Sequence, residues 1–156
     1  MQLVVLGSGD ASANPWRSAP GYLVASGETA VLLDCGSGTL QRIARTGLQP
    51  DALAAVFISH LHLDHWADLL ALLFSFRVSP PCTRQGPLEL HGGPGFPKLV
   101  AELGTLLGKA LVPRHFDVEC FEHEDERFEL GELMCQTWRL AHHPSSLALR
   151  LRAPSG

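Results

Sequence analysis

The sequence predicts a mixed α/β fold organised as one compact domain. Short apolar runs of strand length, rich in β-branched and aromatic residues, alternate along the chain with segments of helical periodicity. The 156 residues, 46% of them hydrophobic, suffice for one hydrophobic core and are too few for two domains. No fixed-period repeat or low-complexity linker divides the chain. We therefore expect helices packed on a sheet within a single unit.

The first part of the chain is expected to be mainly strand. One strand stops at Gly7, and two further strands meet at the Gly27-Glu28 turn, which is typical of a hairpin. A helix with apolar residues at core spacing then ends at Gly47. The expected strands cover residues 3–6, 22–25 and 30–33, and the helix covers 39–46.

The rest of the chain alternates strands and helices. The helix over 66–76 is almost wholly apolar, so we expect it to be buried against a sheet. The acidic run 123–127 is expected to be the solvated tip of a hairpin, with His115 and His123 at the surface. His91 is expected to be a strand-end residue and not a ligand. The expected strands cover residues 53–58, 88–91, 117–121, 133–140 and 146–151, and a further helix covers 97–111.

Composition and charge argue against several classes of protein. The net charge is −4, and the ten Arg and two Lys are scattered along the sequence, so we expect no basic surface that would attract nucleic acid. If the protein binds RNA, it must do so in a local groove. The short N-terminal apolar run lacks a basic flank, and the 66–76 segment is too short to span a bilayer. We therefore expect a cytoplasmic protein without a membrane partner. Far-apart cysteines without C-x-x-C spacing indicate neither a disulfide framework nor a thiolate zinc site, and we expect them to be reduced and mostly buried: Cys35, Cys82, Cys120 and Cys135.

The most informative stretch is SHLHLDH at residues 59–65. Four potential metal ligands, His60, His62, Asp64 and His65, fall within six residues between a strand and a helix. Because side chains at such a turn need not alternate between faces, the first two can converge on one ion while the last two turn toward a second. Imidazole and carboxylate ligands without thiolates suit zinc first, and manganese or iron less well. Two ions roughly 3.5–4 Å apart would clamp a hydroxide and lower the pKa of water, which indicates hydrolytic chemistry.

Other polar residues stand where they can meet this motif. Asp34 ends a strand beside glycines, where it can orient a ligating His through its other ring nitrogen or satisfy turn amides. Asp68, in the first turn of the helix after the motif, either favours the helix dipole or holds a ligating His. His142 and His143 follow a strand, and one of them can supply the third protein ligand that catalytic zinc usually needs.

These motifs resemble those of the metallo-β-lactamase superfamily. The matching segments run in the family's order and are the strand with Gly7-Ser8-Gly9, LLDCGSG at 32–38, SHLHLDH at 59–65 and HHPSSLALRL at 142–151. The resemblance implies an αββα sandwich, in which two mixed sheets face each other with helices outside and metals bound at one sheet edge.

The resemblance also assigns ligands. It implies that His60 and His62 bind one metal with a later His, and that Asp64 and His65 serve the second. The later His is His142, with His143 as the fallback, because the family's ligand is followed four positions on by the start of the next strand, here Ser146-Leu147-Ala148.

Within the superfamily the most similar pattern is the ribonuclease Z-like branch of small phosphodiesterases. It implies a hydrolase with one or two zinc ions that acts on a phosphodiester or related ester of a small molecule or nucleotide, in which Asp64 also accepts a proton from the attacking water. Trp66-Ala67-Asp68 replaces the family's Gly-containing segment and no tRNA-clamping insertion is visible, which disfavours tRNA processing. True β-lactamases generally lack an equivalent of His65, so the presence of this residue disfavours hydrolysis of β-lactam antibiotics. The alternatives are a thioester hydrolase similar to glyoxalase II and a catalytically silent metal-binding module.

The family normally has two more ligands further along the chain, an Asp that bridges both metals and a His that completes the second site. Neither is present in this sequence. We therefore expect residues 1–156 to be the N-terminal part of a longer metallo-β-lactamase-like domain. A sheet edge left open in this way would favour a homodimer.

Overall fold

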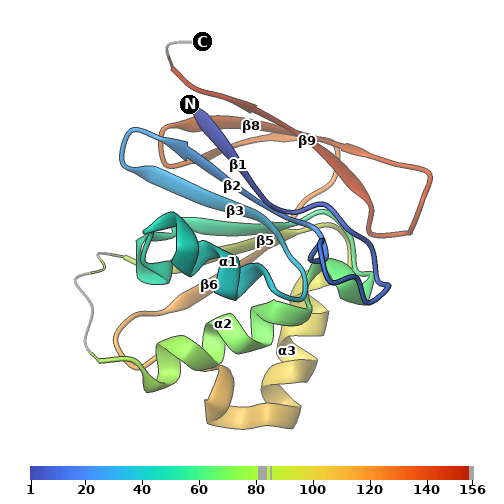
Figure 1. Ribbon diagram of the computed structural model, residues 1–156. Helices are drawn as coiled ribbons and strands as arrows, with labels where there is room; N and C mark the ends of the chain where they lie inside the picture. Colours follow the sequence, from blue (N-terminus) through green and yellow to red (C-terminus); the bar gives the residue numbers. More distant parts are fainter. Residues whose placement is uncertain (81–83, 85, 155–156) are drawn as a thin grey trace.

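The described part of the chain forms two β-sheets and three α-helices. The computed structural model describes residues 1–80, 84 and 86–154. The two sheets face each other, and the helices cover the outer face of the larger sheet (Figure 1). The mixed α/β fold expected from the sequence is confirmed. Of the expected sandwich, the structure shows both sheets, and the α-helices of the described residues all lie on one side of them.

The larger sheet has six strands in the order β1-β2-β3-β4-β5-β6. The first three strands are antiparallel, with β2 and β3 forming the expected hairpin, whereas β3 to β6 run parallel. The carboxyl ends of these parallel neighbours therefore lie at the same edge of the sheet. The bounds are β1 Gln2–Gly7, β2 Gly21–Ser26, β3 Thr29–Cys35, β4 Ala55–Ile58, β5 Leu88–Gly92 and β6 Val118–Glu122.

The helices connect the parallel strands across one face of this sheet. The strands from β3 to β6 are added in chain order, and right-handed crossovers in one direction place all connecting helices on the same side. The apolar helix α2 is buried against the sheet as expected, for example through Leu72 and Phe76. The helices are α1 Thr39–Thr46, α2 Ala67–Val78 and α3 Phe96–Leu107, with single 3-10 turns at Pro50–Ala52, Leu63–His65 and Gly108–Leu111.

The hydrophobic core lies on both faces of the central strands. Leu32 of β3 and Val56 of β4 pack with the helices, whereas Val31 and Ala55 face the smaller sheet and pack against residues such as Leu130. Successive side chains of a strand point to opposite faces, so a strand covered on both sides needs an unbroken apolar run. This explains why β4 consists of Ala, Val, Phe and Ile.

The smaller sheet corrects one expectation. Its three antiparallel strands are β7 Arg127–Leu130, β8 Leu133–Arg139 and β9 Leu147–Arg152. The acidic run 123–127 is not a hairpin tip, because it carries the chain from β6 in the larger sheet to β7 in the smaller one. The segment of β7 carries no strand signal, since two of its four residues are charged.

The expectation that His123 lies at the surface is also wrong. Only 6% of His123 is exposed, and its Nε2 lies 2.8 Å from Nδ1 of the buried His91. Both rings stack on Phe128 of the smaller sheet. The aromatic ring that covers His123 comes from a strand the sequence did not predict, so its burial had no local signal.

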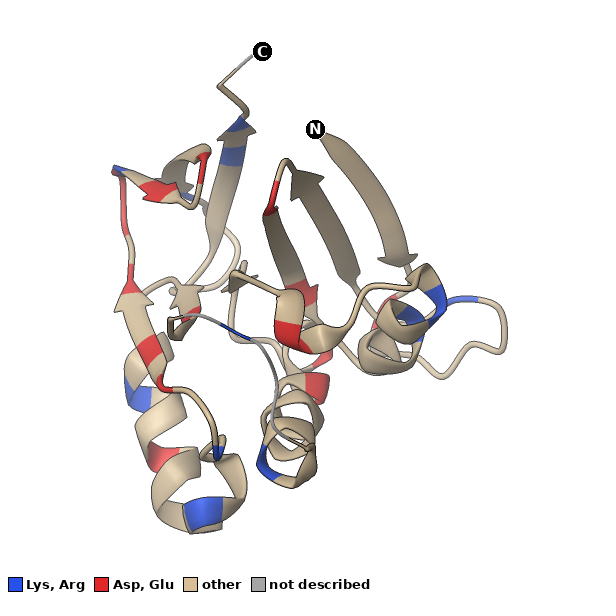
Figure 2. Ribbon diagram, turned by 90° about the vertical axis from the view of Figure 1, so that its left-hand side faces the viewer, with Lys and Arg blue, Asp and Glu red and all other residues tan. Residues whose placement is uncertain are grey.

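The charged residues and the cysteines can be placed in the structure. Figure 2 shows Lys and Arg on helices, on β9 and in loops, without a single basic stripe. Cys35 and Cys135 are buried and Cys120 is partly buried, whereas Cys82 lies outside the described residues. None of the helices in the described part of the chain has the length and apolar character needed to cross a membrane.

Candidate metal centre

The ligand motif lies at the edge of the larger sheet where the parallel strands end. β3 ends at Cys35 and its parallel neighbour β4 ends at Ile58, so Asp34 comes beside Ser59. On the other side, the N–H of Leu147, the first residue of β9, donates to the Ser59 carbonyl at 2.9 Å. Three segments that are distant in the sequence therefore meet at one edge, as is common for sites of α/β sheets.

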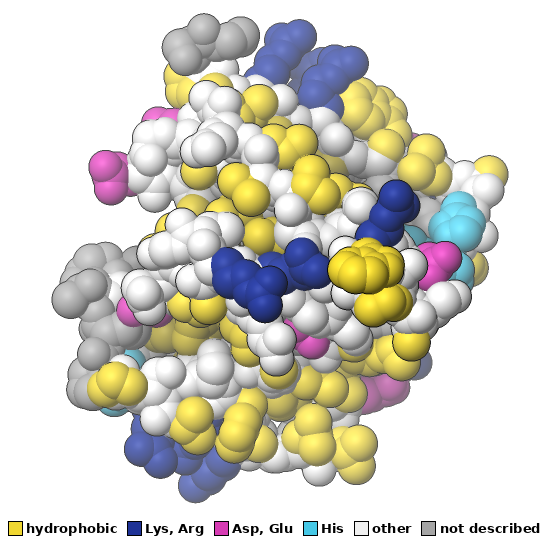
Figure 3. Space-filling view, viewed as in Figure 1, with side chains coloured by type: hydrophobic (Ala, Val, Ile, Leu, Met, Phe, Trp, Pro, Cys, Tyr) yellow, Lys and Arg dark blue, Asp and Glu magenta, His cyan; other side chains and the backbone are white. Residues whose placement is uncertain are grey.

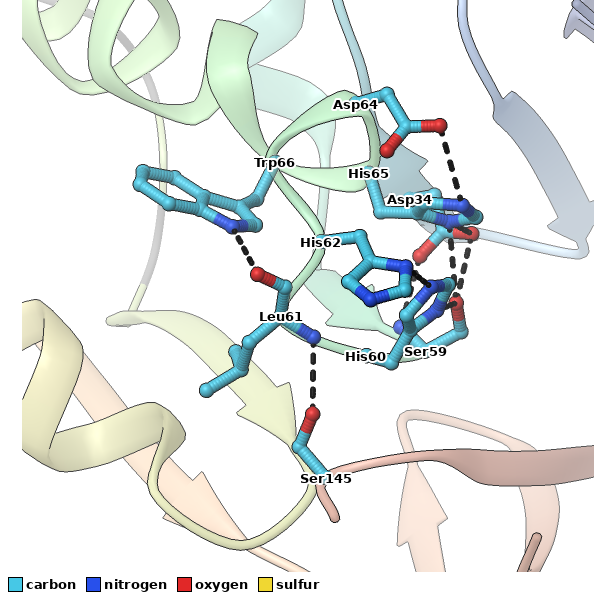
Figure 4. Close-up of polar contacts among 9 residues, drawn as sticks. All are labelled: Asp34, Ser59, His60, Leu61, His62, Asp64, His65, Trp66 and Ser145. Carbon is cyan, nitrogen blue, oxygen red and sulfur yellow. Dashed lines mark hydrogen bonds and ion pairs between the residues drawn. The ribbon is translucent and has the colours of Figure 1, made fainter. Parts of the chain in front are cut away.

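Three histidines come together at this edge. The ligand nitrogens of His60, His62 and His142 all lie within 4.8 Å of one another. Figure 4 shows His60 and His62 side by side, with His60 Nε2 3.0 Å from His62 Nδ1. Metal–nitrogen bonds of about 2.0–2.1 Å in tetrahedral geometry place ligand nitrogens about 3.4 Å apart, so three imidazoles this close together can share one divalent cation. No other group of three or more such ligands occurs in the described residues.

Asp64 and His65 form a second pair of potential ligands beside the triad. Both lie in the 3-10 turn Leu63–His65 that follows His62. Asp64 Oδ2 is 3.7 Å from His65 Nε2, so the two ligand atoms face each other. The other ring nitrogen of His65, Nδ1, lies 2.7 Å from Asp34 Oδ2. The contact to Asp34 orients the imidazole and leaves its Nε2 on the side of Asp64.

Asp34 contacts both a histidine ring nitrogen and a backbone amide, the two kinds of partner expected for it. Its Oδ1 accepts the Ser59 N–H at 2.7 Å, and its Oδ2 accepts the Ser59 hydroxyl at 2.9 Å as well as contacting His65. Asp34 has a φ of 57°, the one positive value among the described residues other than glycine. This left-handed conformation is uncommon for a residue with a Cβ, and the hydrogen bonds of the carboxylate hold it in place.

Asp68 contacts a helix and not a histidine. Its Oδ2 accepts the N–H groups of Gly38 and Leu40 at 2.9 and 3.0 Å, so this residue of α2 caps the first turn of α1. Among the described residues it makes no hydrogen bond to a His side chain. Asp68 therefore acts at a helix terminus, which is one of its two expected roles, but the helix is α1 and not its own helix α2.

The structure also separates His142 from His143. His142 belongs to the triad, whereas Nδ1 of His143 accepts the Ser145 N–H at 3.2 Å and lies 2.7 Å from the Ser145 hydroxyl. The His143 ring centroid is 5.0 Å from that of His62 and 6.3 Å from that of His60. His143 is thus a neighbour of the triad with one ring nitrogen already engaged.

The surroundings set different proton affinities for two of these imidazoles. Burial, together with His65 and His62 nearby, lowers the pKa of His60 to about 4, which favours the neutral form that binds metal. Burial alone would lower the pKa of His65, but the hydrogen bond and charge of Asp34, with a contribution from Asp64, raise it above its usual value.

An open cavity of about 850 Å³ adjoins the metal ligands. The polar loop between β1 and β2 forms one wall with Asp10, Arg17 and Ser18, and the motif forms the other with His62 and Asp64. Figure 3 shows histidine side chains at the surface along one edge of the molecule, next to acidic and basic side chains. A polar molecule entering this cavity would therefore meet a cation and two of the potential ligands.

The sequence did not predict the roles of two serines at the site, Ser59 and Ser145. Ser59 joins Asp34 to the motif, and Ser145 joins the motif to the turn that carries His142. Ser59 directly precedes His60, whereas Ser145 follows His143 by two positions, and nothing in the sequence distinguishes Ser145 from Ser146.

Comparison with known proteins places this geometry in a family. The family profile described as the metallo-beta-lactamase superfamily matches residues 14–152. The chain is 36% identical over 148 residues to a ribonuclease Z of Mycobacterium sp. (strain KMS), an alignment that covers 95% of this chain and 43% of that protein. The chain thus spans less than half the length of this relative.

Solved structures show the same fold. The crystal structure of the short form of human tRNase Z matches with a TM-score of 0.79 and 22% identity, over 99% of this chain and 65% of that one. A diphosphatase from the PhnP family matches with a TM-score of 0.70 and 20% identity, over 96% of this chain and 61% of the other.

Proposed function

Because the chain belongs to the metallo-β-lactamase superfamily, we propose that it is a zinc-dependent hydrolase that cleaves a phosphodiester or a related ester. The observation that carries the proposal is the triad of His60, His62 and His142 beside the Asp64–His65 pair, at the wall of an open cavity. The relatives named ribonuclease Z and diphosphatase support phosphoryl chemistry in preference to thioester hydrolysis.

In this proposal the triad would hold one zinc ion, and Asp64 and His65 would contribute to a second. A bound zinc ion lowers the pKa of water toward neutrality and stabilises negative charge on the attacked group. Asp64 lines the cavity, so its carboxylate is placed to accept a proton from the attacking water. Asp34 keeps His65 in the orientation in which Nε2 faces Asp64.

The cavity supports an anionic substrate. Arg17 lines it together with His62 and Asp64, and a guanidinium group matches the geometry of phosphate oxygens. The net charge of −4 does not favour long nucleic acids, so recognition through this local cation is the simpler arrangement. We therefore propose a small-molecule or nucleotide phosphodiester as the substrate.

The proposal is tested with His62→Ala. Zinc content is measured by elemental analysis, and hydrolysis is followed with bis-p-nitrophenyl phosphate and a panel of thioesters. We expect the variant to lose hydrolysis with its circular dichroism preserved, whereas His115→Ala, which changes an exposed histidine that belongs neither to the triad nor to the lining of the cavity, retains it. Unchanged turnover in His62→Ala would overturn the proposal. Zinc binding without turnover of any substrate would instead indicate a silent metal-binding module.

A further inference from the structure

The two loops that carry the triad are joined by one buried hydroxyl group. His60 and His62 flank Leu61 in the loop after β4, and His142 lies in the turn before β9. The Leu61 N–H donates to Ser145 Oγ at 2.9 Å across 84 residues of sequence (Figure 4). Ser145 is 1% exposed, so water does not compete freely for this bond.

The hydrogen atoms around Ser145 can be assigned from the donors. A backbone N–H can only donate, so the N–H of Ser145 at 3.2 Å makes Nδ1 of His143 an acceptor. The Ser145 hydroxyl, 2.7 Å from the same Nδ1, therefore donates to it. Its lone pairs remain free for the Leu61 N–H. The hydroxyl thus acts as donor within its own turn and as acceptor from the other loop.

The peptide units on both sides of Leu61 are fixed by these contacts. The carbonyl of Leu61 accepts the indole Nε1–H of Trp66 at 3.1 Å, on the opposite side from the bond to Ser145. Leu61 separates His60 from His62, so holding its N–H and its carbonyl sets the backbone direction at both ligands. Figure 4 shows the two bonds leaving Leu61 toward different elements.

Packing leaves the Ser145 turn little freedom to move. A Cβ added to Gly93 would lie 2.0 Å from the Ser145 carbonyl oxygen, so the glycine after β5 is in close contact with the turn. Ser146 closes the same turn from within, because its Oγ accepts the His143 N–H at 3.0 Å. Ser145 is therefore held rigidly and can transmit its position to the loop of His60 and His62.

We propose that Ser145 is a positioning residue, whose hydroxyl holds the His142 turn and the His60–His62 loop in register and thereby sets the affinity of the triad for a divalent cation. This rests on the proposed function only in that the triad binds the metal. Removing the hydroxyl leaves the Leu61 N–H without its acceptor and frees the two loops to separate.

The first test compares Ser145→Ala with Ser146→Ala. Both variants remove one buried hydroxyl from the same turn, but only the first removes a bond between the two loops. Competition with a chelator is expected to show zinc affinity reduced about 10- to 100-fold in Ser145→Ala and nearly unchanged in Ser146→Ala. Ser145→Cys, which keeps a weaker hydrogen-bonding group, should lie in between. Equal losses in the two alanine variants would overturn the proposal.

A double-mutant cycle tests whether Ser145 acts through His142. In a His142→Ala background, Ser145→Ala is expected to cost less zinc affinity than in the parent protein, because the turn that it holds against the His60–His62 loop no longer carries a ligand. The absorption spectrum of the Co²⁺ protein should report the same change in coordination in both single variants. A full additional loss in the double variant would show that Ser145 supports the fold in general, contrary to the proposal.

Amide exchange of the metal-free protein measures the contact itself. We expect hydrogen–deuterium exchange at Leu61 to accelerate in Ser145→Ala and to stay slow in Ser146→Ala. This measurement does not depend on hydrolysis, so an inactive protein would count against the proposed function and leave this result standing. Unchanged exchange at Leu61 in Ser145→Ala would count against the positioning role alone.

Discussion

Nδ1 of His65 lies 2.7 Å from Oδ2 of Asp34, although 31 residues separate the two in the sequence. The contact exists because β3 and β4 are parallel neighbours, so the residues at their carboxyl ends meet at one edge of the sheet. Asp34 also binds Ser59 through both of its oxygens. One carboxylate therefore fixes the start of the motif and its last histidine at the same time.

Replacement of this carboxylate is expected to weaken metal binding without removing a ligand. In Asp34→Asn the amide nitrogen can no longer accept from His65 and Ser59 together, so we expect an affinity for zinc lower by about 10- to 100-fold. Titration calorimetry of the metal-free protein measures it. The exposed Asp117→Asn serves as the matched control, and zinc binding equal in both variants would contradict the prediction.

The two adjacent histidines before β9 are expected to differ in their effect. His142→Ala removes a member of the triad, whereas His143→Ala removes a ring that accepts from Ser145. We expect the loss of zinc affinity in His142→Ala to exceed that in His143→Ala by about tenfold or more. Chelator competition on both variants decides the matter, and the reverse order would show that His143 is the ligand.

Asp68 is expected to affect stability and not metal content. Asp68→Ala leaves the N–H groups of Gly38 and Leu40 without their acceptor at the start of α1, which should reduce the free energy of unfolding by about 1–2 kcal/mol. Urea denaturation measures this change. Asp68→Asn, which retains an acceptor oxygen, should lose less. A large fall in zinc content with unchanged stability would reverse the assignment.

The buried His91 predicts how stability depends on pH. Burial and the adjacent His123 lower its pKa to about 3, whereas an unfolded histidine has a pKa of about 6.5. Between these values the unfolded chain binds a proton that the folded chain does not. The free energy of unfolding should therefore fall as the pH drops below 6.5, by up to about 1.4 kcal/mol per pH unit from this residue. Urea denaturation of the metal-free protein from pH 7.5 to 5 measures the slope.

His91→Gln is expected to flatten this dependence. The groups around the ring are His123 and Glu89, with Glu126 beyond His123. Burial and the charge of Glu119 raise the pKa of Glu89, which acts in the opposite direction, so the difference between variant and parent isolates the imidazole. The exposed His115→Gln is the control. An unchanged slope in His91→Gln would contradict the prediction.

Gly36 is expected to tolerate no side chain. A Cβ at this position would lie 2.0 Å from the carbonyl oxygen of Asp64, so Gly36→Ala should displace the turn that carries Asp64 and His65 and reduce zinc affinity. Gly104→Ala is a matched control, because nothing lies within 4 Å of its Cβ and alanine favours a helix. Crystal structures and zinc titration of both variants test the contrast.

The sequence by itself determined the features that depend on neighbouring residues. Apolar runs and glycine stops located α1, α2 and the first five strands, and the clustering of His60, His62, Asp64 and His65 indicated a metal centre. These signals are local because helix and strand periodicity and the packing of ligands in a turn are properties of a few consecutive residues.

Only the tertiary structure decided which distant residues complete the site. It turned Asp68 toward α1, buried His123 beneath Phe128 and placed Ser145 on Leu61. It also brought His142, which the family resemblance names as the third ligand, next to His60 and His62. Each outcome depends on a contact between segments about 5 to 84 residues apart, made by strand order and by the facing of the two sheets. A single sequence carries no local pattern for such contacts, since the geometry that creates them exists only after the sheets have packed.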